Sequence, residues 1–251
     1  MSGRLDGRVA VLTGAAGGLG SATARRLVGE GCAVACTGLP GDPLDELVAE
    51  LEGAGGRALA LVCDQRDPDA VEAAAVRVRE EWGRVDVLVN NAAVYASRPW
   101  HEITVEDWDR TLEVNLRGCF VWALALRGDL AASPAGRVVN VASLTFFVGF
   151  DGLADYVASK GGIIGLTRTL SREMGPDAVT VNAVSPGAFP TDPEKIHPDP
   201  EGYDRWVLDR QALKRRGRGE DVGDLVVFLA SDEASFITGQ TIMIDGGWVN
   251  H

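Results

Sequence analysis

Short apolar runs alternate along the chain with longer segments in which apolar residues recur every three or four positions. Seven of the short runs have the length and composition of strands, namely Val9–Thr13, Ala33–Thr37, Ala58–Cys63, Val85–Asn90, Arg137–Val141, Val179–Ser185 and Thr241–Asp245. Strands separated by helical segments are typical of parallel sheets, because parallel neighbours need crossover helices that cover both faces. The pattern predicts a doubly wound α/β fold with a parallel seven-stranded sheet.

Helix boundary signals agree with this alternation. Asp67 followed by Pro68 can start a helix that runs to Trp82, because Asp accepts hydrogen bonds from free N–H groups and Pro fits the first turn. The residues Thr104–Asp107 resemble a capping box with Asp in place of Glu. No repeat or linker interrupts the series, which favours one domain over residues 1–251.

The stretch from about 187 to 213 is irregular, rich in Pro, Asp and Glu, and contains Phe189, Tyr203 and Trp206. Long irregular segments inside compact α/β domains are commonly functional loops. We therefore expect a substrate lid here, with disorder as the alternative.

Composition narrows the possible partners. The chain has 24 Lys and Arg against 36 Asp and Glu, a formal net charge of −12, which repels nucleic acid and anionic membrane surfaces. Its four cysteines form no CxxC pair and only three histidines are present, so we expect no metal site and predict reduced thiols in a cytoplasmic protein. No apolar run approaches the length of about 18 residues that a membrane span needs.

The first glycine-rich stretch, TGAAGGLG at residues 13–20, follows the first predicted strand and opens a helix. Gly14, Gly18 and Gly20 allow a sharp turn, a close approach of backbone N–H groups to a pyrophosphate, and tight packing of helix on strand. The spacing differs from GxGxxG, and a turn that merely joins strand to helix is an alternative. Its position after the first strand favours a dinucleotide.

A tyrosine and a lysine stand four positions apart at Tyr156 and Lys160, on one face of a predicted helix. A nearby ammonium group favours the phenolate and lowers the tyrosine pKa from about 10, which makes the phenol a usable acid or base. Ser143, at the end of a predicted strand, can hydrogen-bond the same substrate oxygen. Taken alone, the pair also fits a core tyrosine beside a snorkelling lysine.

Together these motifs resemble those of the short-chain dehydrogenase/reductase family. The matching stretches are TGAAGGLG at 13–20, NNAA at 90–93, EVNLRG at 113–118, Ser143, YVASK at 156–160, SPG at 185–187 and DGG at 245–247. The resemblance runs from about Arg8 to Gly247. It implies a Rossmann fold and hydride transfer between a nicotinamide and a carbonyl or alcohol carbon.

The resemblance also implies roles for individual residues. Tyr156 is the acid/base, Ser143 orients the substrate oxygen, Lys160 lowers the tyrosine pKa and binds the nicotinamide ribose, and Asn115 holds a water in the proton relay. Tyr156 and Lys160 count among the expected cofactor contacts, and the others are Gly14, Gly18, Leu19, Gly20, Gly38, Leu39, Asp64, Asn91, Ala92, Pro186, Gly187, Phe189 and Thr191.

Two positions within the resemblance keep a second interpretation, and a third departs from the family pattern. Asn90 commonly braces the central sheet in the family and can be catalytically silent. Ala93 stands where the family usually has glycine, which adds one methyl group beside the cofactor. Asp64 matches a residue beside the adenine, yet a strand-end Asp also caps the turn that follows it.

The end of the second predicted strand normally separates NAD from NADP, because a carboxylate there accepts ribose hydroxyls and an arginine favours the 2′-phosphate. Gly38 stands where many NAD users carry Asp, and Leu39 stands where many NADP users carry Arg. Asp42 and the negative net charge favour NAD, while Arg66 or Thr37 can still meet a phosphate. We expect NAD or NADP, with a lean toward NAD.

Apolar and aromatic residues suggest the substrate side. Residues 144–150, with Tyr95, Trp100, Phe189 and Trp206, can wall a hydrophobic pocket beside the nicotinamide. The expected substrate contacts are Tyr95, Thr145, Phe150 and Trp206. They indicate a small-molecule, hydrophobic, aromatic or cyclic ketone or secondary alcohol, although ordinary core and interface aromatics are an alternative.

Two other functions stay open. A biosynthetic ketoreductase, epimerase or dehydratase can use the same four catalytic residues on a specialised substrate, and a non-catalytic dinucleotide sensor can keep the fold. The intact Ser, Tyr and Lys set favours an enzyme. Family members are usually dimers or tetramers, and the resemblance leads us to expect a homotetramer.

Overall fold

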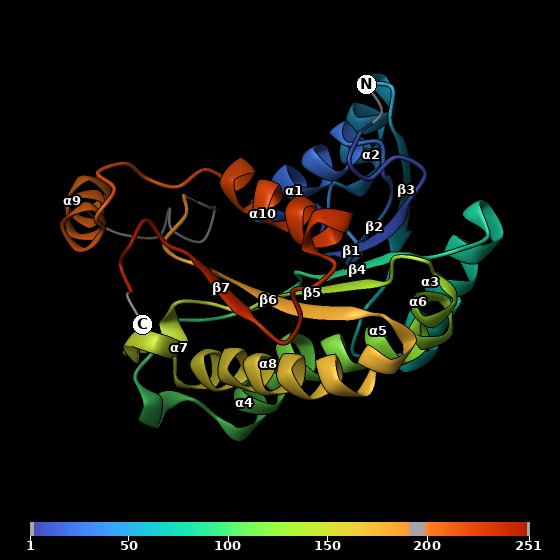
Figure 1. The fold of residues 1–251 in the computed structure, drawn as a ribbon. Helices are drawn as coiled ribbons and strands as arrows, with labels where there is room; N and C mark the ends of the chain where they lie inside the picture. The colour runs from blue at the N-terminus through green and yellow to red at the C-terminus, as the bar shows by residue number, and fades with distance from the viewer. Residues whose placement is uncertain (1–2, 191–198, 250–251) are drawn as a thin grey trace.

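The computed structural model describes residues 3–190 and 199–249, and these hold a seven-stranded sheet in the order β3-β2-β1-β4-β5-β6-β7 (Figure 1). All neighbouring strands run parallel, which confirms the predicted doubly wound fold. The strands are β1 Val9–Thr13, β2 Ala33–Gly38, β3 Arg57–Val62, β4 Val87–Asn90, β5 Arg137–Val141, β6 Thr180–Pro186 and β7 Thr241–Ile244.

The alternation of side chains along the strands builds two cores, one on each face of the sheet. In β1, Ala10 and Leu12 join one buried cluster, whereas Val9 and Val11 join the other. Because both faces are covered by helices, the strand needs no polar face and all five of its residues are buried.

The helices form a layer on each side of the sheet, with two further helices beyond one end (Figure 1). One layer contains α1 Gly18–Gly29, α2 Leu44–Gly53 and α10 Gly219–Ala230. The opposite layer contains α3 Pro68–Trp82, α4 Val105–Leu112, α5 Gly118–Ala125, α6 Arg127–Ala132 and α8 Ala154–Glu173. The two helices beyond the end of the sheet are α7 Thr145–Val148 and α9 Pro200–Arg210.

Local signals explain several element boundaries. The Asp67 carboxylate accepts hydrogen bonds from the N–H groups of Asp69 and Ala70 ahead of α3, as its position predicts. Thr104 and Asp107 form the expected capping box of α4.

β1 and β5 have the predicted bounds, and the ends of the other five strands differ from the predicted ones by one or two residues. At the end of β6, Pro186 is paired with Ile244 of β7 although it has no N–H group, and its carbonyl accepts from the N–H of Leu144 at 3.0 Å. At the start of β4, pairing begins at Val87, two residues later than predicted.

None of the helices in the described ranges combines the length and the apolar character needed to cross a membrane. Cys32, Cys36, Cys63 and Cys119 are buried free thiols. Within the same ranges, no group of His, Cys, Asp and Glu is arranged to hold a metal ion.

Candidate active site

A cavity of about 610 Å³ opens where the carboxyl ends of the strands meet, at the point where the strand order reverses between β1 and β4. Crevices of this kind are where ligands bind in doubly wound folds. The sequence-predicted residues in its wall are Gly14, Gly18, Leu19, Gly20, Gly38, Leu39, Asp64, Asn91, Ala92, Tyr95, Ser143, Thr145, Phe150, Tyr156, Lys160, Pro186, Gly187 and Phe189. Two more, Asn115 and Trp206, lie outside the wall, and Thr191 lies outside the described residues.

The glycine loop between β1 and α1 fits a phosphate group. Gly14 has φ +60°, and a Cβ there would lie 2.8 Å from the Cα of Ala92. A Cβ on Gly20 would lie 2.2 Å from the Gly14 carbonyl oxygen. No side chain caps the start of the helix, and the residues of its first turn, whose N–H groups have no carbonyl to bind within the helix, line the cavity. These features suit the pyrophosphate of a dinucleotide.

Side-chain hydrogen bonds hold that loop against β4. The Thr13 hydroxyl accepts from the N–H groups of Asn91 and Ala92, each at 2.9 Å. In return, the Asn91 amide donates to the carbonyls of Thr13 at 2.9 Å and Gly14 at 3.0 Å. Asn91 therefore belongs to the cavity wall and also fixes the shape of the glycine loop.

At the far end of the cavity, Asp64 caps the turn after β3, which is one of its two expected roles. It lines the wall and accepts a hydrogen bond from the Arg66 N–H at 3.0 Å, which closes the turn after β3. Its carboxylate also pairs with the Arg66 guanidinium at 2.6 Å. These hydrogen bonds from Arg66 lower the pKa of the Asp64 carboxyl, so the acid stays ionised and Arg66 is already engaged.

Ser143 and Tyr156 meet at the centre of the cavity. The Ser143 hydroxyl oxygen accepts from the Thr145 hydroxyl at 2.9 Å and from the Thr145 N–H at 3.2 Å. Tyr156 comes from α8 and its ring lies 5.1 Å from that of Tyr95. Burial of the phenol raises the pKa of Tyr156 to about 12, against a smaller lowering by the Ser143 hydrogen bond.

Lys160 lies one turn further along α8, with only 2% of its surface exposed. Its ammonium donates to the Val141 carbonyl at 2.7 Å and lies 5.5 Å from the centre of the Tyr156 ring. Burial lowers the pKa of Lys160 to about 8. Because the head group is buried, the snorkelling interpretation is wrong.

The predicted lowering of the Tyr156 pKa by Lys160 is also wrong for this arrangement. The tyrosine pKa lies above its ordinary value, because removal of the phenol from water disfavours the phenolate by more than its neighbours favour it. Lys160 is itself desolvated, and its nearest polar partner is a backbone carbonyl rather than the phenol.

Asn115 supports the cavity from behind. It sits in a π-helical turn, η2 Glu113–Arg117, and is fully buried. Its amide oxygen accepts from the Val94 N–H at 2.8 Å, and its NH₂ group donates to the Val94 carbonyl at 2.9 Å and to the Ser159 hydroxyl at 3.1 Å. Both N–H donors are therefore used, and Asn115 reaches the cavity through Val94, which lines it.

Asn90 behaves as the family resemblance suggests. Its amide donates to the Asn140 side chain at 2.8 Å, and the Asn140 amide donates to the Thr167 hydroxyl at 2.9 Å. This buried chain joins β4, β5 and α8, so it holds the helix that carries Tyr156 against the sheet.

The aromatic residues divide into those that line the cavity and those that do not. Tyr95 and Phe150 lie in the wall, as predicted. Trp206 packs edge-to-face on Phe150, with ring centres 5.8 Å apart, and so supports the wall from outside. Trp100 is 76% exposed and takes no part, because it lies in a short surface turn.

Two further aromatic residues in the wall were not among the predicted substrate contacts. Trp248 meets Trp206 at 5.1 Å, and Tyr203 stacks on Trp206 at 5.7 Å. Tyr203 falls three positions before Trp206 on α9, and Trp248 directly follows Gly247 of the DGG motif. Those spacings are the signals that could have identified them.

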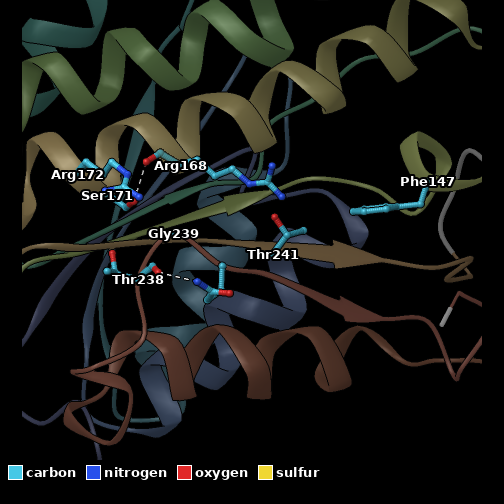
Figure 2. A pocket seen from close by; sticks show the side chains of 8 residues that line it. Phe147, Arg168, Ser171, Arg172, Thr238, Gly239 and Thr241 are labelled. Atoms are coloured by element: carbon cyan, nitrogen blue, oxygen red, sulfur yellow. Dashed lines mark hydrogen bonds between the residues drawn. The ribbon is translucent and has the colours of Figure 1, made fainter. Parts of the chain in front are cut away.

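A second, open groove lies between α8 and the edge strand β7, away from the tyrosine (Figure 2). Arg168 and Arg172 reach into it from α8. Across the groove lie Thr238, which precedes β7, and Thr241, the first residue of that strand. Phe147, which belongs to the stretch 144–150 predicted to wall the substrate pocket, lines this groove and not the cavity that holds Tyr156.

Known proteins resemble the chain over nearly its whole length. A family model described as enoyl-(acyl carrier protein) reductase matches residues 14–249. The chain is 39% identical to a 3-oxoacyl-(acyl-carrier-protein) reductase of Thermotoga maritima, over 98% of this chain and 99% of that protein. It is 37% identical to cis-4-hydroxycyclohexanecarboxylate dehydrogenase of Sinomonas cyclohexanicum, over 96% of each. A crystal structure of a dehydrogenase/reductase from Sinorhizobium meliloti matches with a TM-score of 0.91 and 37% identity, over 98% of this chain and 96% of that one.

Proposed function

The chain belongs to the short-chain dehydrogenase/reductase family of oxidoreductases, which use NAD or NADP, and we propose that it interconverts a hydrophobic, aromatic or cyclic ketone and the matching secondary alcohol. One observation carries the proposal. Ser143, Tyr156 and Lys160 lie in the wall of a cavity that also contains the glycine loop and the aromatic residues Tyr95, Phe150 and Trp248.

When bound, the nicotinamide supplies or accepts the hydride, and the side chains handle the proton. In the direction of reduction, the Tyr156 phenol donates its proton to the carbonyl oxygen while the Ser143 hydroxyl hydrogen-bonds the same oxygen. The raised pKa of Tyr156, about 12, keeps the phenol protonated at neutral pH. This state suits reduction, because the proton donor is present before the substrate binds.

Lys160 and Asn115 act beside the reacting groups. We assign the Lys160 ammonium to the ribose hydroxyls next to the nicotinamide, since it lies in the cavity wall and the Val141 carbonyl accepts one of its three N–H bonds. Asn115 fixes Val94 in the wall, and the second lone pair of its amide oxygen remains for a relay water.

We propose NAD as the preferred cofactor. Arg66 is the basic residue nearest the end of β3 in the cavity wall, and its guanidinium is bound by Asp64. Leu39 and Gly17 provide no positive charge where a 2′-phosphate would need one.

We also propose that the protein is a cytoplasmic homotetramer. Phe120 and Leu124 lie one turn apart on α5 and are 47% and 60% exposed, which leaves an apolar strip that a second copy of the chain would cover. The reduced state of four buried thiols fits the cytoplasm. Sedimentation that yields a monomer contradicts the assembly.

A substrate panel tests the reaction. Purified protein is given NADH or NADPH with aryl ketones, cyclohexanone carboxylates, small keto acids and a 3-oxoacyl thioester. We expect kcat/KM to be at least about tenfold higher for the cyclic or aryl ketones, because an apolar wall discriminates by about 1–3 kcal/mol. Preference for the thioester supports a biosynthetic ketoreductase instead, preference for small keto acids contradicts the apolar pocket, and cofactor binding without any turnover supports a sensor.

A further inference from the structure

The far end of the cavity has an unusual arrangement where β2 ends. Gly38 is the last residue of the strand and has no side chain, yet the space beside it is filled. A Cβ on Gly38 would lie 2.6 Å from the Oδ2 atom of Asp42 and 3.4 Å from its Cβ and Cγ atoms. The Asp42 carboxylate therefore stands where a side chain at position 38 would begin.

The turn after β2 holds the carboxylate there. Its Oδ2 atom accepts from the Leu39 N–H at 2.7 Å, and the Asp42 N–H donates to the Leu39 carbonyl at 3.1 Å. Gly41 makes the turn possible with φ +93°, a conformation that side chains rarely adopt. These two hydrogen bonds fold Asp42 back over the strand end instead of letting it extend into solvent.

The carboxylate is available to a ligand. Asp42 lines the cavity and makes no ion pair with another described residue. The nearby guanidinium of Arg66 is occupied by Asp64. One oxygen of Asp42 accepts the Leu39 N–H, and the other oxygen has no hydrogen bond to a described residue.

We propose that Asp42, rather than a residue of β2, selects the cofactor by accepting hydrogen bonds from the adenosine ribose hydroxyls. A 2′-phosphate at that place would bring a second negative charge against the carboxylate, so the same group excludes NADP. The inference rests on the proposed function, because it assumes that this cavity binds a nicotinamide dinucleotide.

The shared space between positions 38 and 42 makes their substitutions interdependent. Gly38→Asp would place an acid at the end of β2, as in many NAD-dependent proteins. Here, however, its Cβ meets the Asp42 carboxylate, so the turn must open or the two carboxylates repel. Removal of the Asp42 carboxylate makes room for the new side chain. The two substitutions must therefore be non-additive.

The experiment measures the dissociation constants of NADH and NADPH by nicotinamide fluorescence on the full chain. The variants are Asp42→Asn, Asp42→Ala, Gly38→Asp and the double variant Gly38→Asp with Asp42→Ala. The matched control is Asp45→Asn, which removes one exposed carboxylate three residues away and outside the cavity wall. Thermal unfolding confirms that each variant is folded.

We expect the wild type to prefer NADH. Asp42→Asn and Asp42→Ala weaken NADH binding by about 10- to 100-fold, because hydrogen bonds to a charged group contribute about 1.5–3 kcal/mol. NADPH binding stays the same or improves, and the control keeps the wild-type ratio. Gly38→Asp alone weakens NADH binding, and the double variant regains a preference for NADH.

Each opposite result is informative. An unchanged ratio of the two affinities in Asp42→Asn overturns the proposal, and tighter NADH binding by Gly38→Asp alone overturns the shared-space argument. If the wild type binds NADH but turns over no ketone, only the proposed reaction fails. If it binds neither nucleotide, both inferences fail together.

Discussion

The two ends of the central sheet bury polar groups in opposite ways. At the amino end, Asp86 is fully buried and accepts from the Val9 N–H at 2.9 Å, from the Ser133 hydroxyl at 2.5 Å and from both arms of Arg84. At the carboxyl end, Lys160 is just as buried, yet it makes no ion pair with a described residue. The charge of Asp86 is compensated by Arg84, whereas the charge of Lys160 has no opposite charge beside it among the described residues.

The pKa values at the carboxyl end express that difference. Burial lowers the pKa of Lys160 to about 8 and raises the pKa of Tyr156 to about 12, in each case toward the neutral form. Groups whose pKa values are shifted by burial within a cavity are typical of catalytic sites. The comparison indicates that the amino end serves stability and that the carboxyl end gives up stability for proton transfer.

The sharpest test of the carboxyl end is Tyr156→Phe, which removes only the phenolic oxygen. We expect kcat to fall by about 10²- to 10⁴-fold, because general acid catalysis contributes that much. The affinity for the cofactor should stay within about threefold of the wild type, a margin of less than 1 kcal/mol. Steady-state kinetics and nicotinamide fluorescence measure the two effects.

Tyr95→Phe is the matched control for that variant, since Tyr95 lies in the same wall with its ring 5.1 Å away. It should lose far less activity than Tyr156→Phe. Near-normal turnover by Tyr156→Phe removes the proposed acid from the mechanism.

The amino end should respond in stability and not in turnover. Asp86→Ala leaves the Val9 N–H, the Ser133 hydroxyl and Arg84 without their acceptor, and we expect the free energy of unfolding to fall by about 3–5 kcal/mol. Urea denaturation measures the loss, and kcat of the folded fraction should be unchanged.

Glu233→Gln is the control at the same end of the molecule. Its ion pair with Arg4 is exposed, so its removal should change the free energy of unfolding by less than about 1 kcal/mol. A loss of turnover in folded Asp86→Ala would mean that the two ends are not separate in function.

The sequence predicted the sheet well because buried strands on both faces leave continuous apolar runs, as β1 shows. The family motifs also indicated Ser143 and Tyr156 as a pair, and the fold brings both into one cavity wall, Ser143 from just after β5 and Tyr156 from α8. It gave the wrong direction for the Tyr156 pKa, because desolvation depends on tertiary packing around the phenol, which spacing along a helix does not reveal.

Other features of the site depended on contacts between distant segments. Trp248 enters the wall because the C-terminal segment packs on α9, at a ring distance of 5.1 Å from Trp206. Asn115 lies behind the cavity wall, and both N–H donors of its amide bind Val94 and Ser159. Asp42 reaches the end of β2 only because the following turn folds back on itself. Motif matching identifies which residues belong to the site, but not which of their hydrogen-bonding atoms remain free to bind a ligand.

Lys160→Met should stabilise the protein while it removes activity. The unfolded lysine has a pKa of about 10.5 and the folded one about 8, so the folded protein binds the proton less tightly. Below about pH 8 Lys160 is protonated in both the folded and the unfolded state, and the buried charge lowers the free energy of unfolding by its full amount. Between about pH 8 and 10.5 the folded state loses this proton while the unfolded state keeps it, so the stability of the wild type rises. At pH 7 we expect a gain of about 1–3 kcal/mol in the variant.

Urea denaturation at pH 7 and pH 9.5 measures both parts of this prediction. The difference in the free energy of unfolding between Lys160→Met and the wild type should be smaller at pH 9.5, because Lys160 is then largely neutral in the folded wild type. Lys214→Met, which removes an exposed lysine, is the control and should show little dependence on pH. A destabilised Lys160→Met at pH 7 contradicts the view that this end gives up stability.

The smallest expected effect on kcat concerns the orientation of the Ser143 hydroxyl group. Its oxygen accepts two hydrogen bonds from Thr145, one from the hydroxyl at 2.9 Å and one from the N–H at 3.2 Å, so its own proton is left to point toward the phenol or the substrate oxygen. Thr145→Val keeps the shape and removes the hydroxyl donor. We expect kcat to fall about three- to tenfold, equivalent to about 1 kcal/mol, with KM little changed. Thr145→Ser keeps the donor and should stay near the wild type. Equal activity of Thr145→Val and Thr145→Ser would show that the Thr145 hydroxyl does not orient Ser143. A loss confined to Thr145→Val shows that the hydrogen bonds at the carboxyl end direct a proton. The hydrogen bonds to Asp86 at the amino end stabilise the fold instead.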